Sequence, residues 1–290
     1  MQDADSAPRP AAVVITVAPV DYAHIDPFPS AAALAEDICA SHAAGAAVVH
    51  FHVTDAKGAA TSDTTFFDGV VEQVRERSDI IVQASTGGVG VPWEVRTASL
   101  KARNIEMASL NMGSCNLFGR AYINTPADIA ALGTSMAAAK VVPDMCFFEP
   151  GFFTSLDALE NRVPPAQRNV YSLCLGFPGT LPATVANLAF MMSKLPSGAE
   201  WTLVHHGAPD FALLAAAVSA GGNIRVGFED SRELGAGACA IRNAELVVRA
   251  AALVRQLGRT VATPAEVRRR YAITVPAAAA PAKPAALSRC

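Results

Sequence analysis

The stretch VVHFHVTD (Val48–Asp55) decides the fold class and points to the chemistry. It is a nearly continuous apolar run, which is typical of a parallel β-strand that is covered on both faces. Side chains two positions apart on a strand point the same way. His50 and His52 therefore share one face of this strand.

Seven other apolar runs resemble this one, and patterns with helical spacing separate them. Strand–helix units repeated eight times in one domain predict an α/β fold, the (β/α)8 TIM barrel, with an open doubly wound sheet as the alternative. The predicted strands are Val13–Pro19, Ala47–Val53, Ile80–Thr86, Ile105–Met112, Lys140–Phe148, Val170–Phe177, Trp201–Gly207 and Asn223–Asp230.

Capping residues mark several of the helices between these strands. Ser30 can cap a helix that runs to Ala44, where Gly45 stops it. Thr125-Pro126 is a typical helix start. Further helices are predicted over Pro182–Leu195, Phe211–Ala220 and Cys239–Leu257.

The composition indicates one catalytic domain, residues 11–275, between two tails. Residues 1–10 are polar, and Pro276–Cys290 is an Ala/Pro-rich segment; neither can bury a core, so both are predicted to be disordered and flexible. The net charge of −3 and the pI of about 6.1 give no reason to expect nucleic acid or a membrane surface as a partner. Scattered cysteines and an acidic start that makes a poor signal peptide predict a cytoplasmic protein.

A second string, IRVGFED (Ile224–Asp230), places one arginine and two acids in an apolar run. Burying charged side chains in a barrel is costly, so we expect these residues to have a function. Strand spacing predicts that Arg225 points inward beside Glu229, with room between them at Gly227. Asp230 has the opposite parity but lies where the strand turns into a loop. The pair Arg225 and Asp230 is either catalytic or a structural ion pair.

Barrel closure separates the second and eighth strands only by the first, so the two strings can meet. Active sites of barrels lie at the C-terminal strand ends, where His50, His52 and Glu229 are expected. Two imidazoles and one carboxylate form an open metal site, for which zinc is the first choice and non-haem iron remains possible. The alternative is that the histidines are ordinary core residues.

Hydroxyl and glycine residues at neighbouring strand ends suit an anionic substrate. The predicted substrate-binding residues are Ser85, Thr86, Gly87, Gly88, Ser109 and Asn111. Hydroxyls and exposed backbone N–H groups near glycines bind carboxylates, although an ordinary glycine turn has the same sequence. One histidine of the pair His205-His206 is expected to face the interior and orient substrate, and His205 is our choice.

The ordered motifs VVHFHVTD, QASTGG, ASLNMGS, LGFPG, GGNIRVGFED and LGRTVATPAEVRR resemble the β-keto acid cleavage enzyme family over about Val13 to Tyr271. The resemblance implies a zinc-dependent barrel, usually a homotetramer, that condenses a β-keto acid with acetyl-CoA to give acetoacetate and an acyl-CoA. By position, His50, His52 and Glu229 match the zinc ligands of the family, and Arg225 and Asp230 match its catalytic pair. Ser85, Gly88 and Ser109 match residues that hold the substrate carboxylate.

The chain also departs from the family pattern. Thr54 stands where members often have an arginine, and Ala23 stands where a member acting on an amino substrate has an acid. These departures argue against an amino substrate, and His24 and His205 indicate a neutral or anionic distal group. Two other functions remain open: a metal-dependent aldolase or hydrolase that does not use CoA, and a catalytically inactive metal-binding barrel.

Overall fold

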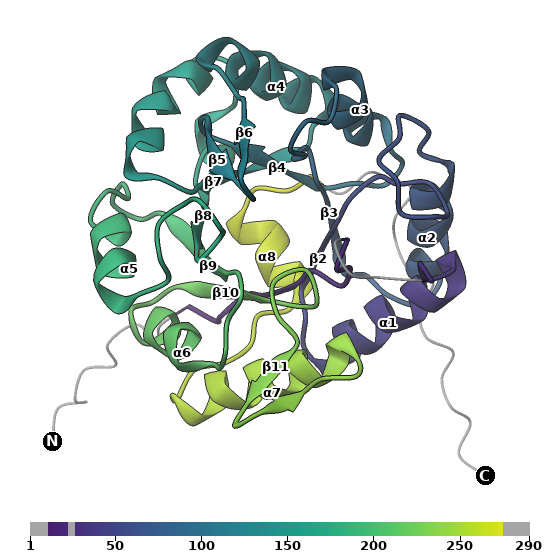
Figure 1. The fold of residues 1–290 in the computed structure, drawn as a ribbon, viewed down its shortest axis with the longest axis vertical. Helices are drawn as coiled ribbons and strands as arrows, with labels where there is room; N and C mark the ends of the chain where they lie inside the picture. Colours follow the sequence, from purple (N-terminus) through teal and green to yellow (C-terminus); the bar gives the residue numbers. More distant parts are fainter. Residues whose placement is uncertain (1–10, 23–26, 275–290) are drawn as a thin grey trace, which may run out of the picture.

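Eight parallel strands close into a barrel in the computed structural model, which describes residues 11–22 and 27–274 (Figure 1). The closed order is β1-β10-β9-β8-β7-β4-β3-β2. The strands are β1 Ile15–Val17, β2 Val48–Phe51, β3 Ile81–Ala84, β4 Met107–Asn111, β7 Val142–Phe147, β8 Val170–Leu175, β9 Glu200–His205 and β10 Asn223–Val226. The predicted barrel is confirmed, and the open sheet is excluded. The tails predicted to be disordered, with Ala23 and His24, lie outside the described residues.

All helices but the last surround the barrel on its outer face, and the last lies across the end of the barrel (Figure 1). They are α1 Ala31–Ala44, α2 Thr65–Arg75, α3 Trp93–Ala98, α4 Pro126–Ala139, α5 Val185–Met192, α6 Ala212–Ser219, α7 Asn243–Gln256 and α8 Pro264–Arg270, with short 3-10 turns η1 Ser99–Lys101, η2 Pro150–Leu159 and η3 Pro165–Gln167. The predicted caps of α1 and α4 are confirmed: Ser30 accepts the N–H of Ala33, and Thr125 forms a capping box with Asp128. Among the described helices, none has both the length and the apolar character that crossing a bilayer requires.

The helix predicted over Cys239–Leu257 begins later than expected. Its first residue, Cys239, belongs instead to a hairpin of β11 Glu233–Gly235 and β12 Ala238–Cys239, and α7 starts at Asn243. The hairpin turns through Gly235, Ala236 and Gly237, which all have positive φ. A left-handed backbone cannot continue into a helix, so the turn displaces the helix start.

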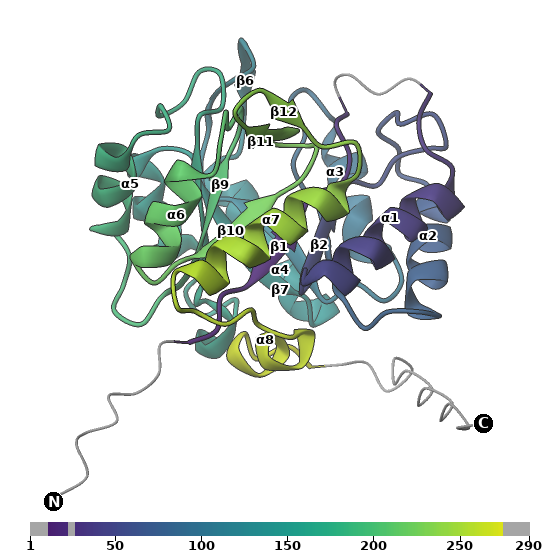
Figure 2. The same cartoon turned by 90° about the horizontal axis from the view of Figure 1, so that it is seen from below.

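A second hairpin, β5 Cys115–Leu117 and β6 Arg120–Tyr122, follows β4. Its tip, Phe118-Gly119, has φ values of 52° and 72°, the arrangement of a tight hairpin turn. Both hairpins stand at the C-terminal end of the barrel, on the side opposite α8 (Figure 2). They form part of the rim of the mouth where a barrel places its active site.

The opposite, N-terminal end is closed by an apolar plug. Residues from six barrel strands or their flanks pack there with Tyr271 and Val267 of the α8 segment. The plug consists of Val14, Ala47, Val48, Ile81, Met107, Val142, Val170, Ala262, Val267, Tyr271 and Ile273. Helix α8 lies directly beneath this end (Figure 2). The lower half of the interior is therefore packed core, and polar chemistry is confined to the upper half.

A buried ion-pair network attaches α8 to the barrel. The side chain of Glu106, 3% exposed, accepts from Arg268 Nε at 2.6 Å and from Arg75 Nη2 at 2.7 Å. Arg268 also donates to the carbonyl of Asp79 at 2.7 Å. One carboxylate thus neutralises two nearly buried guanidinium groups from α8 and α2.

Replacing Glu106 with glutamine is expected to lower the free energy of unfolding by about 3 kcal/mol, because it leaves two buried cations without their common counter-charge. Urea denaturation measures the change. Glu36→Gln is the matched control, since its ion pair with Arg77 is exposed and contributes less than about 1 kcal/mol. Equal stability losses for the two variants would contradict this role of Glu106.

Candidate active site

A cavity of about 820 Å³ opens at the C-terminal end of the barrel. Most predicted site residues line it: His50, His52, Ser85, Gly87, Gly88, Ser109, Asn111, Arg225, Glu229 and Asp230. Thr86 and His205 are not among its lining residues. A second cavity of about 600 Å³, beside hairpin β5–β6 and η2, is lined by none of these residues. The large cavity is therefore the candidate active site.

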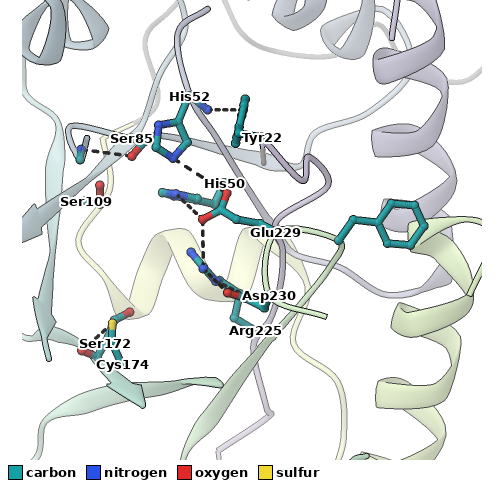
Figure 3. Close-up of polar contacts among 12 residues, drawn as sticks. Tyr22, His50, His52, Ser85, Ser109, Ser172, Cys174, Arg225, Glu229 and Asp230 are labelled. Atoms are coloured by element: carbon teal, nitrogen blue, oxygen red, sulfur yellow. Dashed lines mark hydrogen bonds and ion pairs between the residues drawn. The ribbon is translucent and has the colours of Figure 1, made fainter. Parts of the chain in front are cut away.

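Two imidazoles and one carboxylate converge in this cavity (Figure 3). His50 Nε2 lies 3.8 Å from Glu229 Oε1, and His52 Nε2 lies 3.9 Å from Glu229 Oε2. The possible ligand atoms all lie within 4.8 Å of one another, whereas two ligands of one tetrahedral zinc lie about 3.3 Å apart. Small side-chain movements are enough to close that difference.

The chemistry of these three groups fits a metal ion. Glu229 Oε2 is buried and, within residues 11–22 and 27–274, accepts no hydrogen bond. Burial lowers the pKa of His50 well below its ordinary value and also lowers the pKa of His52, so both rings stay neutral and can ligate. A buried carboxylate oxygen without a donor, facing two neutral imidazoles, is a natural place for a cation.

A hydrogen-bonded chain behind His50 selects the nitrogen that faces the cavity. Gln83 Nε2 donates to Asp144 Oδ2 at 2.9 Å, which turns its carbonyl oxygen toward His50 Nδ1 at 2.8 Å. The Nδ1 atom therefore carries the proton, and Nε2 presents its lone pair toward Glu229. Ser172 Oγ donates to Asp144 at 2.8 Å and holds this carboxylate in place. Partners of this kind orient the ligands of metal sites.

The carboxylate of Glu229 owes its position to Arg225. Arg225 donates to Asp230 from Nε at 2.7 Å and from Nη2 at 2.6 Å, and Nη2 also reaches Glu229 Oε1 at 3.2 Å. Burial alone would lower the pKa of Arg225, but the two carboxylates raise it above its ordinary value. The predicted proximity of Arg225, Glu229 and Asp230 is confirmed, but it does not arise from the strand spacing on which the prediction was based.

Strand parity does not bring Glu229 to Arg225, because β10 ends at Val226. Gly227 has a φ of 140°, and a Cβ atom there would collide with the backbone of Ala18. The chain turns at this glycine, and the N–H of Asp230 donates back to its carbonyl at 3.0 Å. This turn, and not the alternation of a strand, directs both Glu229 and Asp230 at the guanidinium.

The hydroxyls of Ser85 and Ser109 are available to an anion. Ser85 Oγ accepts from the N–H of Gly87 at 3.2 Å, and Ser109 Oγ accepts from the N–H of Thr86 at 3.1 Å. Across the described part of the chain, neither hydroxyl donates its own proton to a neighbour, so both O–H groups can bind a carboxylate. The Thr86 side chain instead donates to the carbonyl of Ser109 at 2.6 Å and links the two strand ends.

A buried arginine lies behind this loop. Arg96, 7% exposed, donates to the carbonyl of Thr86 at 2.9 Å, to the hydroxyl of Tyr122 at 2.7 Å and to Asn124 Oδ1 at 3.0 Å. These acceptors are neutral, and the described residues include no ion-pair partner for Arg96. Its uncompensated charge favours binding of an anion at the Ser85–Gly88 loop.

The inward histidine after β9 is His206, and our choice of His205 placed the wrong ring in the cavity. His206 lines the large cavity, as does Val204 two residues earlier. His205 lies on the other face of β9, where it lines a small pocket with Phe211 and Leu246. Two consecutive histidines indicate that one of them faces inward. An unbroken apolar run does not show which residues of the strand face the interior, so the sequence could not identify which histidine this is.

Three contributors to the site were missed in the sequence. Gln83 lies two residues before Ser85 and therefore shares its face, which is a signal that could have identified it. Asp144 lies inside the predicted strand Lys140–Phe148, and Arg96 resembles an ordinary helix residue. Aromatic residues that line the cavity, such as Phe177, looked like core.

Comparison with known proteins is consistent with this geometry. The family model of the beta-keto acid cleavage enzyme matches residues 13–273. The 3-keto-5-aminohexanoate cleavage enzyme of Fusobacterium nucleatum is 32% identical over 81% of this chain and 86% of its own length. The 3-oxoadipate:acetyl-CoA acetyltransferase of Cupriavidus necator is 31% identical over 80% and 83% of the two chains. The 3-dehydrocarnitine:acetyl-CoA trimethylamine transferase of Rhizobium meliloti is 29% identical over 83% and 88%.

Solved structures share the fold. The apo structure of ObcA superposes with a TM-score of 0.72 at 18% identity, covering 86% of this chain and 66% of ObcA. At this identity, the likeness concerns the barrel alone.

Gln83→Met is expected to weaken metal binding about 10- to 100-fold, because Met keeps the volume but releases His50 Nδ1 from its acceptor. Titration of the metal-free protein against a competing chelator measures the affinity. Gln73→Met is the matched control, since Gln73 on α2 bonds only the carbonyl of Gly69 among the described contacts. Unchanged affinity in the Gln83 variant would exclude the orienting role.

Proposed function

Because this chain belongs to the beta-keto acid cleavage enzyme family, we propose that it condenses a β-keto acid with acetyl-CoA. The products are acetoacetate and the CoA ester of the shortened acid. The observation that carries the proposal is the convergence of His50, His52 and Glu229 beside the Arg225–Asp230 pair in one cavity. Relatives named as acetyl-CoA transferases at about 30% identity support acetyl-CoA as the co-substrate.

The substrate carboxylate binds at the ends of β3 and β4. The O–H groups of Ser85 and Ser109 donate to its oxygens, and the backbone around Gly87 and Gly88 allows close approach. Arg96 adds positive charge behind this loop. The carboxylate is thereby anchored while the ketone extends toward His50 and Glu229.

Zn²⁺ held by His50, His52 and Glu229 would supply Lewis-acid polarisation of the substrate oxygens, which acidifies the carbon between them. Asp230 is the base: its carboxylate lines the cavity, and Arg225 holds it through two hydrogen bonds. The proton moves from the substrate carbon to an Asp230 oxygen. Arg225 remains protonated throughout, because the two acids stabilise its charge.

The remaining steps exchange acyl groups without a further reactant. The substrate carbanion attacks the thioester carbon of acetyl-CoA, and CoA leaves as a thiolate. The thiolate attacks the original ketone, the carbon–carbon bond breaks, and the departing acetoacetate carbon recovers its proton from Asp230. Arg225 is placed to stabilise the oxyanions that form.

We further propose a cytoplasmic enzyme that assembles as a homotetramer. Among the described residues the cysteines are free, which suits a reducing compartment. The tetramer rests on family resemblance.

Purified protein is expected to contain about one zinc per chain, and His52→Ala is expected to remove it, because one imidazole of the ligand set is lost. Elemental analysis by mass spectrometry gives the metal content. His42→Ala on α1 is the control, since His42 bonds the carbonyl of Ala46 away from the cavity. Full zinc content in the His52 variant would refute the ligand assignment.

Metal-loaded protein is expected to form acetoacetate from acetyl-CoA and a member of a β-keto acid panel. Asp230→Asn should lower kcat about 10²- to 10⁴-fold while zinc and fold are retained, because the amide cannot accept the proton. Asp210→Asn is the control, since Asp210 accepts the N–H of Ala212 at the start of α6 and does not line the cavity. Undiminished turnover would remove Asp230 from the mechanism, and absence of product from every acid would favour a CoA-independent aldolase or hydrolase, or an inactive barrel.

A further inference from the structure

Four rings form a continuous surface on one side of the active-site cavity. They are Phe118 at the tip of hairpin β5–β6, Phe148 after β7, Phe177 after β8 and His206 after β9, and together they are called the aromatic wall. His206 stacks on Phe177 with ring centroids 4.7 Å apart. Phe148 meets Phe177 at 5.0 Å, and Phe118 meets His206 at 5.3 Å.

The aromatic wall faces the metal ligands across the barrel. In the closed strand order, β8 lies diametrically opposite β2, which carries His50. Figure 3 shows Ser172 and Cys174 of β8 on the far side of the interior from His50 and His52. A substrate anchored at β3 and β4, with its ketone near the ligands, therefore has the wall beside the rest of its chain.

Among the described residues, the buried charges that line the cavity near the aromatic wall already have partners. Asp144 on β7 is hydrogen-bonded to Gln83 and Ser172, and Arg225 is already bound by two carboxylates. Arg120 and Arg232 also line the cavity, but both side chains are exposed at its mouth, where water solvates them, and Arg232 lies over the ring of Phe228. A charged group pressed against the rings would lose its water without gaining a counter-ion, which is costly.

We propose that the aromatic wall binds the chain beyond the ketone of the β-keto acid, and that this chain is uncharged and apolar or aromatic. The proposal rests on the function proposed above. Phe118 is 50% exposed beside the cavity, and an exposed apolar surface that continues a ligand site is typical of a binding surface. Rings in stacked and edge-on arrangements present flat apolar faces to a ligand.

The other ligand that enters this cavity, acetyl-CoA, suits the wall less well. The arm of CoA carries amide groups, which need hydrogen-bond partners when they are buried. The three phenyl rings supply none, and Nδ1 of His206 is enclosed by protein without a described partner. An apolar substrate chain fits such a surface better than the CoA arm does.

Calorimetric titration of the metal-loaded protein, without acetyl-CoA, tests the proposal by measuring the Kd of individual acids. Relative to 3-oxopentanoate, 3-oxooctanoate and 3-oxo-5-phenylpentanoate are expected to bind more tightly, by up to about fourfold for each added CH₂ group. 3-Oxoadipate and 3-dehydrocarnitine, with charged chain ends, are expected to bind no more tightly than 3-oxopentanoate. Tighter binding of either charged acid than of the uncharged ones would overturn the proposal.

Phe118→Ala and Phe177→Ala are expected to weaken binding of 3-oxo-5-phenylpentanoate about tenfold and to change the Kd of 3-oxopentanoate less than twofold. Phe118 is half exposed, so its variant tests the wall even if the Phe177 variant fails to fold. Phe190→Ala on the exposed side of α5 is the matched control and should bind like the parent protein.

Kinetics separate this proposal from the function on which it rests. If the Phe variants raise the KM for acetyl-CoA and leave the Kd of every acid unchanged, the wall belongs to CoA and the proposal is wrong, while the reaction stands. If the metal-loaded protein converts none of the acids, the proposed function fails and the substrate class fails with it. Preferential conversion of the uncharged acids supports both.

Discussion

The desolvated charge of Arg225 is the constraint on which the active site depends. Its side chain is 10% exposed inside the barrel, and a buried guanidinium is tolerated only when carboxylates neutralise it. Glu229 and Asp230 supply that charge, and they reach it because the backbone turns at Gly227. The same turn delivers Glu229 to His50 and His52. Balancing one cation therefore brings together the proposed metal ligand and the proposed base, which share a single guanidinium.

The barrel interior is divided into a packed lower half and a polar upper half. The apolar plug over α8 removes water from the floor, so every polar group above it must find a partner in the protein or a ligand. Asp144, Gln83 and His50 form a continuous chain of hydrogen bonds. Among the described residues, Glu229 Oε2 lacks a donor, and the O–H groups of Ser85 and Ser109 lack acceptors. These groups belong to residues that line the cavity, and they are the positions proposed for a cation and an anion.

The strands were readable from the sequence because parallel strands covered on both faces are long apolar runs. The site was readable in part because polar residues at the ends of those runs are exceptional. Strand parity was correct for His50 and His52, which lie at and just beyond the end of β2, but it failed beyond Val226, where a positive φ at Gly227 ends the strand. Hairpin β5–β6 was missed because its left-handed tip uses Phe118, a residue type that seldom marks such a turn. The reaction itself came from family resemblance, since spacing alone reveals a metal site and not its substrate.

His50, Gln83 and Arg225 lie on strands, whereas the rings of the aromatic wall lie on loops and a hairpin tip, and this difference has a physical basis. Proton transfer and metal ligation require groups held within fractions of an ångström, and His50, Gln83 and Arg225 lie on strands that hold each other in register. Recognition of the substrate chain depends on dispersion and desolvation, which tolerate larger displacements, and the rings of Phe118, Phe177 and His206 lie on a hairpin tip and on loops. A change in one of these rings alters the surface proposed to meet the chain without moving a proposed ligand of the metal. This arrangement is consistent with the relatives, which are about 30% identical to this chain over most of the barrel and have different β-keto acids in their names. Selection on substrate can therefore act at the mouth while the chemistry below it stays constant.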